Sequence, residues 1–164
     1  MANAHTGWYR EKLLDLFQIV LEDCEEVTIE NITFQRSVRT FMDTKEPLLR
    51  SDWTIYRGGA VLVKNSRNVS IERCTFRDIG SNGVFVDGDN EQIAIPRSHF
   101  RCIGASALCF VGRPDSVRSP LFEYNETQPF PNLDLEKGPK SPNYPNNLSA
   151  HFVHSRYLNP PFLS

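Results

Sequence analysis

The chain has 164 residues, of which 40% are hydrophobic and 23% charged, and its formal net charge is -2. This length is enough for one domain with its own core. The mixed charges exclude a general attraction to nucleic acid or to an anionic membrane. No apolar run approaches the roughly 20 residues of a membrane helix, and the first residues lack the charged and apolar regions of a signal peptide.

The first predicted elements are strands. Residues 12–20 are expected to enter directly as a strand, and Val27 and Ile29 then alternate with polar residues ahead of Phe34. An apolar spacing of two with many β-branched residues is typical of strands, because the period of a helix is 3.6. Residues 12–36 therefore form the expected first coil of a repeat.

The pattern of residues 26–34 returns further along the chain, at 68–76 and at 91–100, and a weaker copy begins at Asn147. Each copy reads apolar-x-apolar, two polar residues, a small residue and then Phe after one more position. A unit of about 24 residues with three short strands cannot bury its own apolar face, so neighbouring units must stack. We therefore predict an all-β fold, a right-handed parallel β-helix of about three to four coils.

The repeat also predicts which side chains of the third strand of each unit point inward. The inward row is Val61, Val84 and Leu108, and the outward row is Leu62, Phe85 and Cys109. An outward row this apolar needs an explanation. Either an insertion or a missing part of the protein covers it, or Phe85 is a platform on which a sugar ring stacks.

Two insertions interrupt the repeat, at residues 37–58 and 112–146, and the second is rich in Pro and Asn. Loops of this length are usually functional or wrap a neighbouring surface. The predicted organisation is one partial β-helix domain over residues 1–164, with central coils at 59–111 and a last partial coil and tail at 147–164. Because a solenoid needs capped ends, we expect the chain to be a fragment of a larger protein.

Several strings of the sequence resemble a family of large right-handed β-helix proteins, many of which are carbohydrate-active. The strings are Arg50-Ser51-Asp52-Trp53, Ile55-Tyr56-Arg57-Gly58-Gly59-Ala60, residues 68–76, residues 110–112 with 117–124, Gly138-Pro139-Lys140 and Tyr144-Pro145. The resemblance covers most of residues 12–155. Related β-helix enzymes are pectinases, polysaccharide lyases and glycosidases, so the resemblance implies a glycan substrate and an extracellular or periplasmic parent protein.

Asp87 and Asp89 are the first candidate catalytic residues, in the turn Asp-Gly-Asp-Asn that follows the outward row. Two carboxylates at a strand end can serve a glycosidase as general acid and base, or as acid and nucleophile. The alternative is that the string is simply turn chemistry. A calcium site at this turn is a weaker alternative, and otherwise we predict no metal and no cofactor.

A second candidate cluster lies in the first insertion and consists of Asp52, Trp53, Tyr56 and Arg57. Asp52 is a further catalytic candidate. Trp and Tyr offer flat faces to sugar rings, and Arg can bind a uronate carboxylate through two hydrogen bonds. Arg113 opens the second insertion and is expected on the same rim. Alternatively, the two aromatic residues staple the loop onto the coil, and Arg113 forms salt bridges within its own loop.

The four cysteines, Cys24, Cys74, Cys102 and Cys109, show neither a CxxC pair nor a metal-ligand spacing with His. We expect free thiols that pack as small hydrophobic groups.

The predicted function is that of a carbohydrate-active β-helix module, a glycoside hydrolase or a polysaccharide lyase acting on an extracellular polysaccharide. Two alternatives stay open: a non-catalytic glycan-binding or surface module, and an inactive truncated fragment. The expected partner is a polysaccharide or oligosaccharide.

Overall fold

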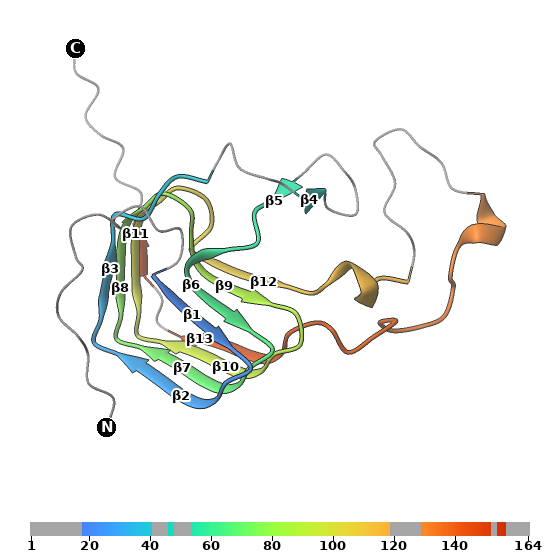
Figure 1. Cartoon of the computed structure of the whole chain (residues 1–164), viewed down its shortest axis with the longest axis horizontal. Coiled ribbons are helices and arrows are strands. Elements are labelled where there is room, and N and C mark those ends of the chain that lie inside the picture. Colours follow the sequence, from blue (N-terminus) through green and yellow to red (C-terminus); the bar gives the residue numbers. More distant parts are fainter. Residues whose placement is uncertain (1–17, 41–45, 48–53, 119–128, 152–153, 157–164) are drawn as a thin grey trace, which may run out of the picture.

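Four coils of three strands each make up the body of the molecule (Figure 1). The computed structural model describes residues 18–40, 46–47, 54–118, 129–151 and 154–156. The strands of the first two coils are β1 (Ile19–Glu22), β2 (Glu25–Glu30), β3 (Thr33–Gln35), β6 (Gly59–Lys64), β7 (Arg67–Glu72) and β8 (Thr75–Ile79). Those of the last two are β9 (Asn82–Asp87), β10 (Glu91–Pro96), β11 (His99–Ile103), β12 (Leu108–Val111), β13 (Asn146–His151) and β14 (His154–Arg156).

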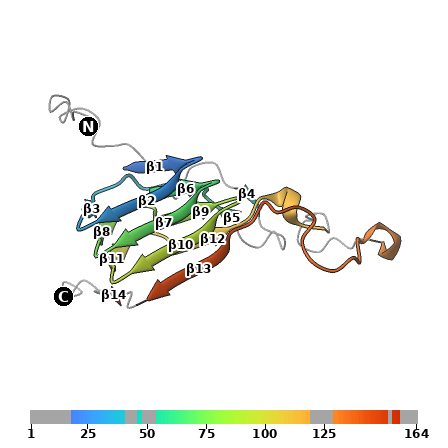
Figure 2. The ribbon, with the colours of Figure 1, turned by 90° about the horizontal axis from the view of Figure 1, so that it is seen from below.

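Corresponding strands of successive coils pair in parallel and form three sheets of four strands. Their orders are β1-β6-β9-β12, β2-β7-β10-β13 and β3-β8-β11-β14, which we call sheets A, B and C. Figure 2 shows the coils lying one beside the next along the solenoid. The prediction of an all-β parallel β-helix is confirmed, because all strand pairs within these three sheets are parallel.

The predicted phase of the repeat is also confirmed. Val61 pairs with Val84, and Val84 with Leu108, within sheet A. In sheet C the three phenylalanines of the repeat, Phe34, Phe76 and Phe100, lie in register. Their rings stack with centroids 4.6 Å apart, which forms a continuous aromatic column inside the core.

The bends between sheets occur at the same positions in every coil. Among the described residues, twelve other than glycine have a positive φ, and all of them fall into four such rows. The rows are Asp23 and Asn65 (continued by Gly88); Glu26, Asn68, Gln92 and Asn147; Asn31, Arg73 and Arg97; and Arg36, Asp78 and Cys102. A left-handed residue at a fixed phase redirects the chain without breaking the register of the strands.

Buried polar side chains satisfy the backbone at these bends. The Ser66 amide donates to Asn90 Oδ1 (2.9 Å), and the Cys74 amide donates to Ser98 Oγ (3.1 Å). Asn82 Nδ2 donates to the carbonyl of Gly58 (2.7 Å). Since an unpaired buried amide is costly, these small polar residues let one coil stack closely on the next.

The first insertion begins later than residue 37. The Gly80 amide donates to the Ser37 carbonyl (3.3 Å), and Thr40 Oγ1 donates to Ser81 Oγ (3.1 Å), so the first coil keeps its stacking through residue 40. The insertion contains an antiparallel pair, β4 (Glu46–Pro47) and β5 (Thr54–Ile55). The described part of the second insertion contains two short 3-10 turns, η1 (Pro114–Ser116) and η2 (Phe130–Asn132).

The structure covers only part of the predicted N-terminal strand but all four cysteines. The expected strand at residues 12–20 lies mostly outside the described residues, and β1 begins at Ile19. All four cysteines are free thiols, as predicted; Cys74 is buried and the other three are half-buried. Within the described ranges, no helix is long and apolar enough to cross a membrane.

Candidate functional site

Asp87 lies between two arginines at the end of β9. Arg57 Nη1 is 2.7 Å from Asp87 Oδ1, and Arg113 Nη2 is 2.6 Å from Asp87 Oδ2. The exposed fraction of the side chain is 4% for Asp87, 14% for Arg57 and 34% for Arg113. The carboxylate is therefore engaged on both oxygens by charge-assisted contacts.

These contacts join the two insertions. Arg57 precedes β6, where Gly59 pairs with Asn82 at the start of β9, whereas Asp87 ends β9. The ion pair between Arg57 and Asp87 therefore connects the segment before β6 with the far end of β9. Arg57 Nη2 also donates to the carbonyl of Gly112 (2.9 Å), the residue before Arg113. Both arginines were predicted on one rim, and the structure brings them together on Asp87.

Asp89 has a different environment. Arg67 Nη2, at the start of β7, is 3.3 Å from Asp89 Oδ2 in a largely exposed pair. Asp87 thus faces the arginines over sheet A, while Asp89 faces sheet B, and the two carboxylates have no partner in common. The third catalytic candidate, Asp52, lies outside the described residues.

The predicted stacking residues do not present an open aromatic surface. Phe85 and Leu62 lie outside the core cluster, as expected for outward residues, but Phe85 is 0% exposed and Leu62 is buried. A role of Phe85 as an exposed platform for a sugar ring therefore does not agree with the structure. The burial of Phe85 and Leu62 agrees with the alternative, in which other parts of the protein cover the outward row. Tyr56 is half-buried and its carbonyl accepts from Asn82 Nδ2 (3.2 Å). Trp53 lies outside the described residues.

A hollow of about 720 Å³ lies at the corner where sheet C turns into sheet A. Three successive coils line it, with Ser37 and Arg39 from the first, residues 78–80 from the second and residues 102–104 from the third. We call this the corner hollow. Its lining combines a guanidinium, a carboxylate and a hydroxyl with the half-buried side chains of Cys102 and Ile103.

Two glycines allow the coils to approach each other beside the corner hollow. A Cβ on Gly80 would lie 2.6 Å from the Arg39 amide nitrogen and 2.7 Å from the Ser37 carbonyl oxygen. A Cβ on Gly104 would lie 2.7 Å from the carbonyl oxygen of Gly80. Any side chain at these positions would push the coils apart, so glycine at both maintains the shape of the hollow.

The polar side chains that line the corner hollow keep donors and acceptors available for a ligand. Among the described residues, neither Arg39 nor Asp78 forms an ion pair, and both are exposed. Ser37 Oγ accepts from the Gly80 amide (3.1 Å) and keeps its own proton to donate. The sequence analysis did not identify this site, although one signal for it is present: the pair Ile-Gly occurs at residues 79–80 and again at 103–104.

In the part of the chain that the structure describes, no set of three or more His, Cys, Asp or Glu residues is arranged to hold a metal ion. Searches against protein families, curated proteins and solved structures found no match to this chain.

Proposed function

We propose that this chain is a carbohydrate-binding β-helix module that holds a glycan in the corner hollow. The observation that carries the proposal is the hollow itself, about 720 Å³ in volume and lined by three coils with uncommitted polar side chains. This volume lies within the range of about 300–1,000 Å³ that is usual for small-molecule sites. An extracellular or periplasmic parent protein belongs to the same proposal.

The lining suits sugar hydroxyls, which both donate and accept hydrogen bonds. Arg39 supplies donors only and Asp78, when ionised, acceptors only. Together they can therefore donate to one sugar hydroxyl and accept from its neighbour. The Ser37 hydroxyl adds one more donor. Cys102 and Ile103, which are only half-buried, add apolar surface next to these groups, against which the C–H face of a sugar ring packs.

Binding is better supported than catalysis. A glycosidase needs two carboxyl groups that flank the scissile bond, at roughly 5–10 Å from each other. The described lining of the corner hollow contains one, Asp78. Asp87 is bound by two arginines, and Asp89 is paired with Arg67. A hydrolase or lyase activity would therefore depend on residues such as Asp52 that are not among these groups.

The experiment measures binding of the whole chain to a panel of soluble polysaccharides by affinity electrophoresis and calorimetry. We expect at least one polysaccharide to bind, and Arg39→Ala and Asp78→Ala each to weaken that binding at least fivefold. The matched control replaces a pair at the neighbouring corner, Arg73→Ala with Glu30→Ala, whose ion pair of 2.8 Å lies away from the hollow.

Two outcomes would overturn the proposal. One is that no polysaccharide binds to the folded chain, as judged by an unchanged circular dichroism spectrum. The other is that the hollow variants and the control variant weaken binding equally. Release of reducing ends or of unsaturated sugar from the same panel would establish an enzyme instead of a binding module.

A further inference from the structure

The outer face of sheet C carries a row of arginines next to the corner hollow. Gln35 of β3, Arg77 of β8 and Arg101 of β11 are in register. Both arginines are exposed. Arg156 of β14 takes the same position in the fourth coil. Neighbouring strands of a sheet lie about 4.8 Å apart, so the row places an arginine at equivalent positions of the second, third and fourth coils.

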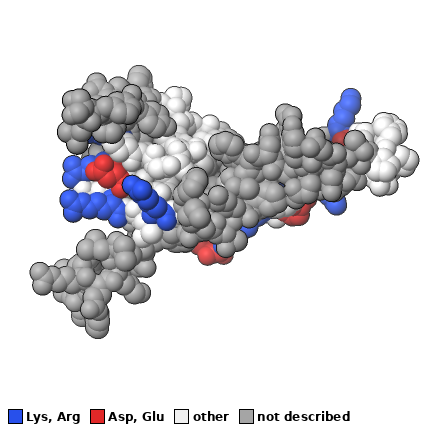
Figure 3. All heavy atoms as spheres, turned by 90° about the horizontal axis from the view of Figure 1, so that it is seen from above, with Lys and Arg blue, Asp and Glu red and all other residues white. Residues whose placement is uncertain are grey.

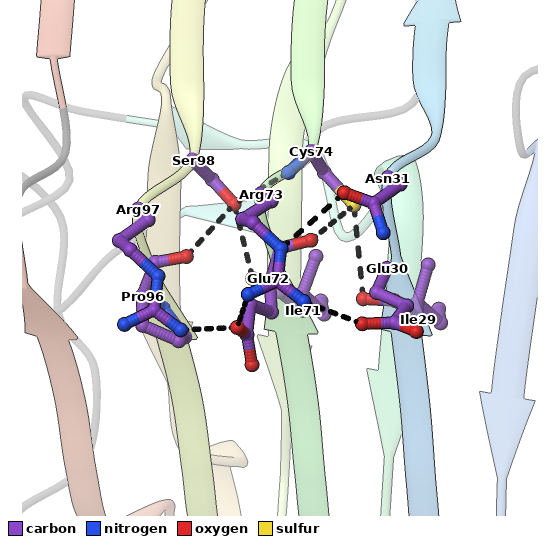
Figure 4. A network of polar contacts seen from close by, with 10 residues as sticks. All are labelled: Ile29, Glu30, Asn31, Ile71, Glu72, Arg73, Cys74, Pro96, Arg97 and Ser98. Atoms are coloured by element: carbon purple, nitrogen blue, oxygen red, sulfur yellow. Dashed lines mark hydrogen bonds and ion pairs between the residues drawn. The ribbon is translucent and has the colours of Figure 1, made fainter.

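The arginines at the next corner of the solenoid are neutralised. Between sheets B and C, Arg73 forms ion pairs with Glu30 (2.8 Å) and with Glu72, and Arg97 forms an ion pair with Glu72. Figure 4 shows these four side chains in one row across the coils, with each acid between or beside the bases. Two carboxylates thus balance two guanidiniums there.

On the sheet C face, the described residues show no such balance. Arg77 Nε donates to the neutral amide of Gln35 (2.8 Å to Oε1), and among the described residues Arg101 forms no ion pair. The side chains that the structure describes on this face and on the adjoining bend include Arg36, Arg39, Arg77 and Arg101 against the carboxylate of Asp78, an excess of three positive charges. In Figure 3, Lys and Arg side chains gather at the left end of the molecule, where sheet C lies, around a smaller acidic group.

From this contrast we infer that the glycan is acidic. Resting on the proposed function, the inference is that a polysaccharide with carboxylate or sulfate groups runs along the solenoid axis over sheet C, with one sugar in the corner hollow. Its anionic groups then meet the exposed guanidiniums of Arg77 and Arg101, which lie at equivalent positions of successive coils. Asp78 stays available for hydroxyl groups.

The chemistry of the row favours such a chain. A guanidinium offers a planar fork of donors that fits a carboxylate or sulfate through two parallel hydrogen bonds. Each exposed contact is weak and is screened by salt. A repeating anion that engages several arginines at once is therefore a better partner for this face than a small anion.

The test compares matched polysaccharides on the whole chain, at low and at physiological salt. Polygalacturonate supplies carboxylates and dextran sulfate supplies sulfates, with galactan and dextran as their neutral counterparts. We expect at least one acidic polymer to bind at least tenfold more tightly than its neutral counterpart, with affinity falling as salt rises. The two acidic arms distinguish a carboxylate from a sulfate ligand.

The variants locate the binding surface. Arg77→Gln with Arg101→Gln should weaken acidic binding at least tenfold and leave neutral binding unchanged. Arg73→Gln with Arg97→Gln removes the same charge from the corner between sheets B and C, which lies outside the proposed path of the polysaccharide, and should leave acidic binding within about twofold of the unmodified chain.

The outcomes separate this inference from the proposed function. If neutral polymers bind through Arg39 and Asp78 as tightly as acidic ones, the inference is overturned and the proposed function stands. If no polymer binds, both are overturned. Equal loss in the two arginine variants, or equally tight binding of polyglutamate, would also overturn the inference, because either would reveal non-specific attraction to any polyanion.

Discussion

At the scale of single residues, the environment of Asp87 favours a structural role for this carboxylate over a catalytic one. A general acid or nucleophile needs an oxygen that faces the substrate, but both oxygens of Asp87 are within 2.7 Å of an arginine. The carboxylate also holds together residues from the two insertions. We therefore expect the Asp87 carboxylate to contribute to the stability of the fold and not to a catalytic step.

We predict that Asp87→Asn lowers the free energy of unfolding by about 3 kcal/mol, because it leaves two guanidiniums facing each other without a compensating charge. Asp89→Asn is the control, since its pair with Arg67 is largely exposed and should contribute less than about 1 kcal/mol. Urea unfolding followed by circular dichroism measures both. A loss at Asp87 no larger than that at Asp89 would show that the buried cluster is not a structural element.

Gly80 provides a second prediction at this scale. Gly80→Ala places a methyl group 2.6 to 2.7 Å from backbone atoms of residues 37 and 39, so the coils must separate, at a cost of roughly 2 kcal/mol or more. Gly138 is the matched control: its φ of +83 strains an alanine, but the space around it is empty. Thermal unfolding should show the larger loss for Gly80→Ala, together with weaker glycan binding, and an equal loss would contradict the close approach.

At the scale of elements, the sequence determines the strands and their register more fully than the site. The alternation of Val84 and Val86 and the recurrence of Phe34, Phe76 and Phe100 are local patterns, and each coil repeats them at the same phase. Parallel stacking then follows, because equivalent residues of successive coils must pair.

The site depends on contacts that no local pattern encodes. Phe85 follows the alternation of its strand, yet its complete burial requires cover from outside its own coil. The corner hollow requires Ser37 and Arg39, which the repeat assigned to an insertion, to stack on residues 78–80. Whether an arginine is paired or free depends equally on the preceding coil, as Glu30 and Gln35 illustrate.

The ion row between sheets B and C predicts a loss of stability in acid. The hydrogen bond from Arg97, helped by the charges of Arg73 and Arg97, holds the pKa of Glu72 below its ordinary value of 4.5. Because the pKa in the folded state is the lower one, the stabilisation is fully present above pH 4.5 and is lost as the pH falls through the folded-state pKa.

Glu72→Gln tests this directly. The unmodified chain should lose more stability than the variant between pH 7 and pH 3, as measured by the urea midpoint at each pH. Some acid sensitivity should remain in the variant, because hydrogen bonds from Asn143 and from the Glu136 amide also lower the pKa values of Asp115 and Asp134. Identical pH profiles for the two proteins would show that ionisation of Glu72 does not contribute to the stability of the fold.

At the scale of the whole molecule, stability is expected to vary along the solenoid. Each coil contacts only its neighbours, so a central coil is supported on two faces and an end coil of the described stack on one. The burial follows this order. Ile71 of β7 and Ile93 of β10 are fully buried, whereas Val27 of β2 and Leu148 of β13 are only partly buried.

We therefore predict that backbone amides of β7 and β10 exchange with solvent most slowly and that protection falls toward β2 and β13. The end coils open without unfolding the centre, because their opening breaks one interface of the stack instead of two. Hydrogen exchange followed by mass spectrometry on the whole chain measures the gradient. Phe76→Ala should flatten it, since Phe76 packs between Phe34 and Phe100 and its loss removes both stacking contacts of the central column, at a cost of about 3 kcal/mol. Uniform protection of all four coils would instead show that the stack unfolds as one cooperative unit, in which case the nearest-neighbour description of this β-helix is wrong.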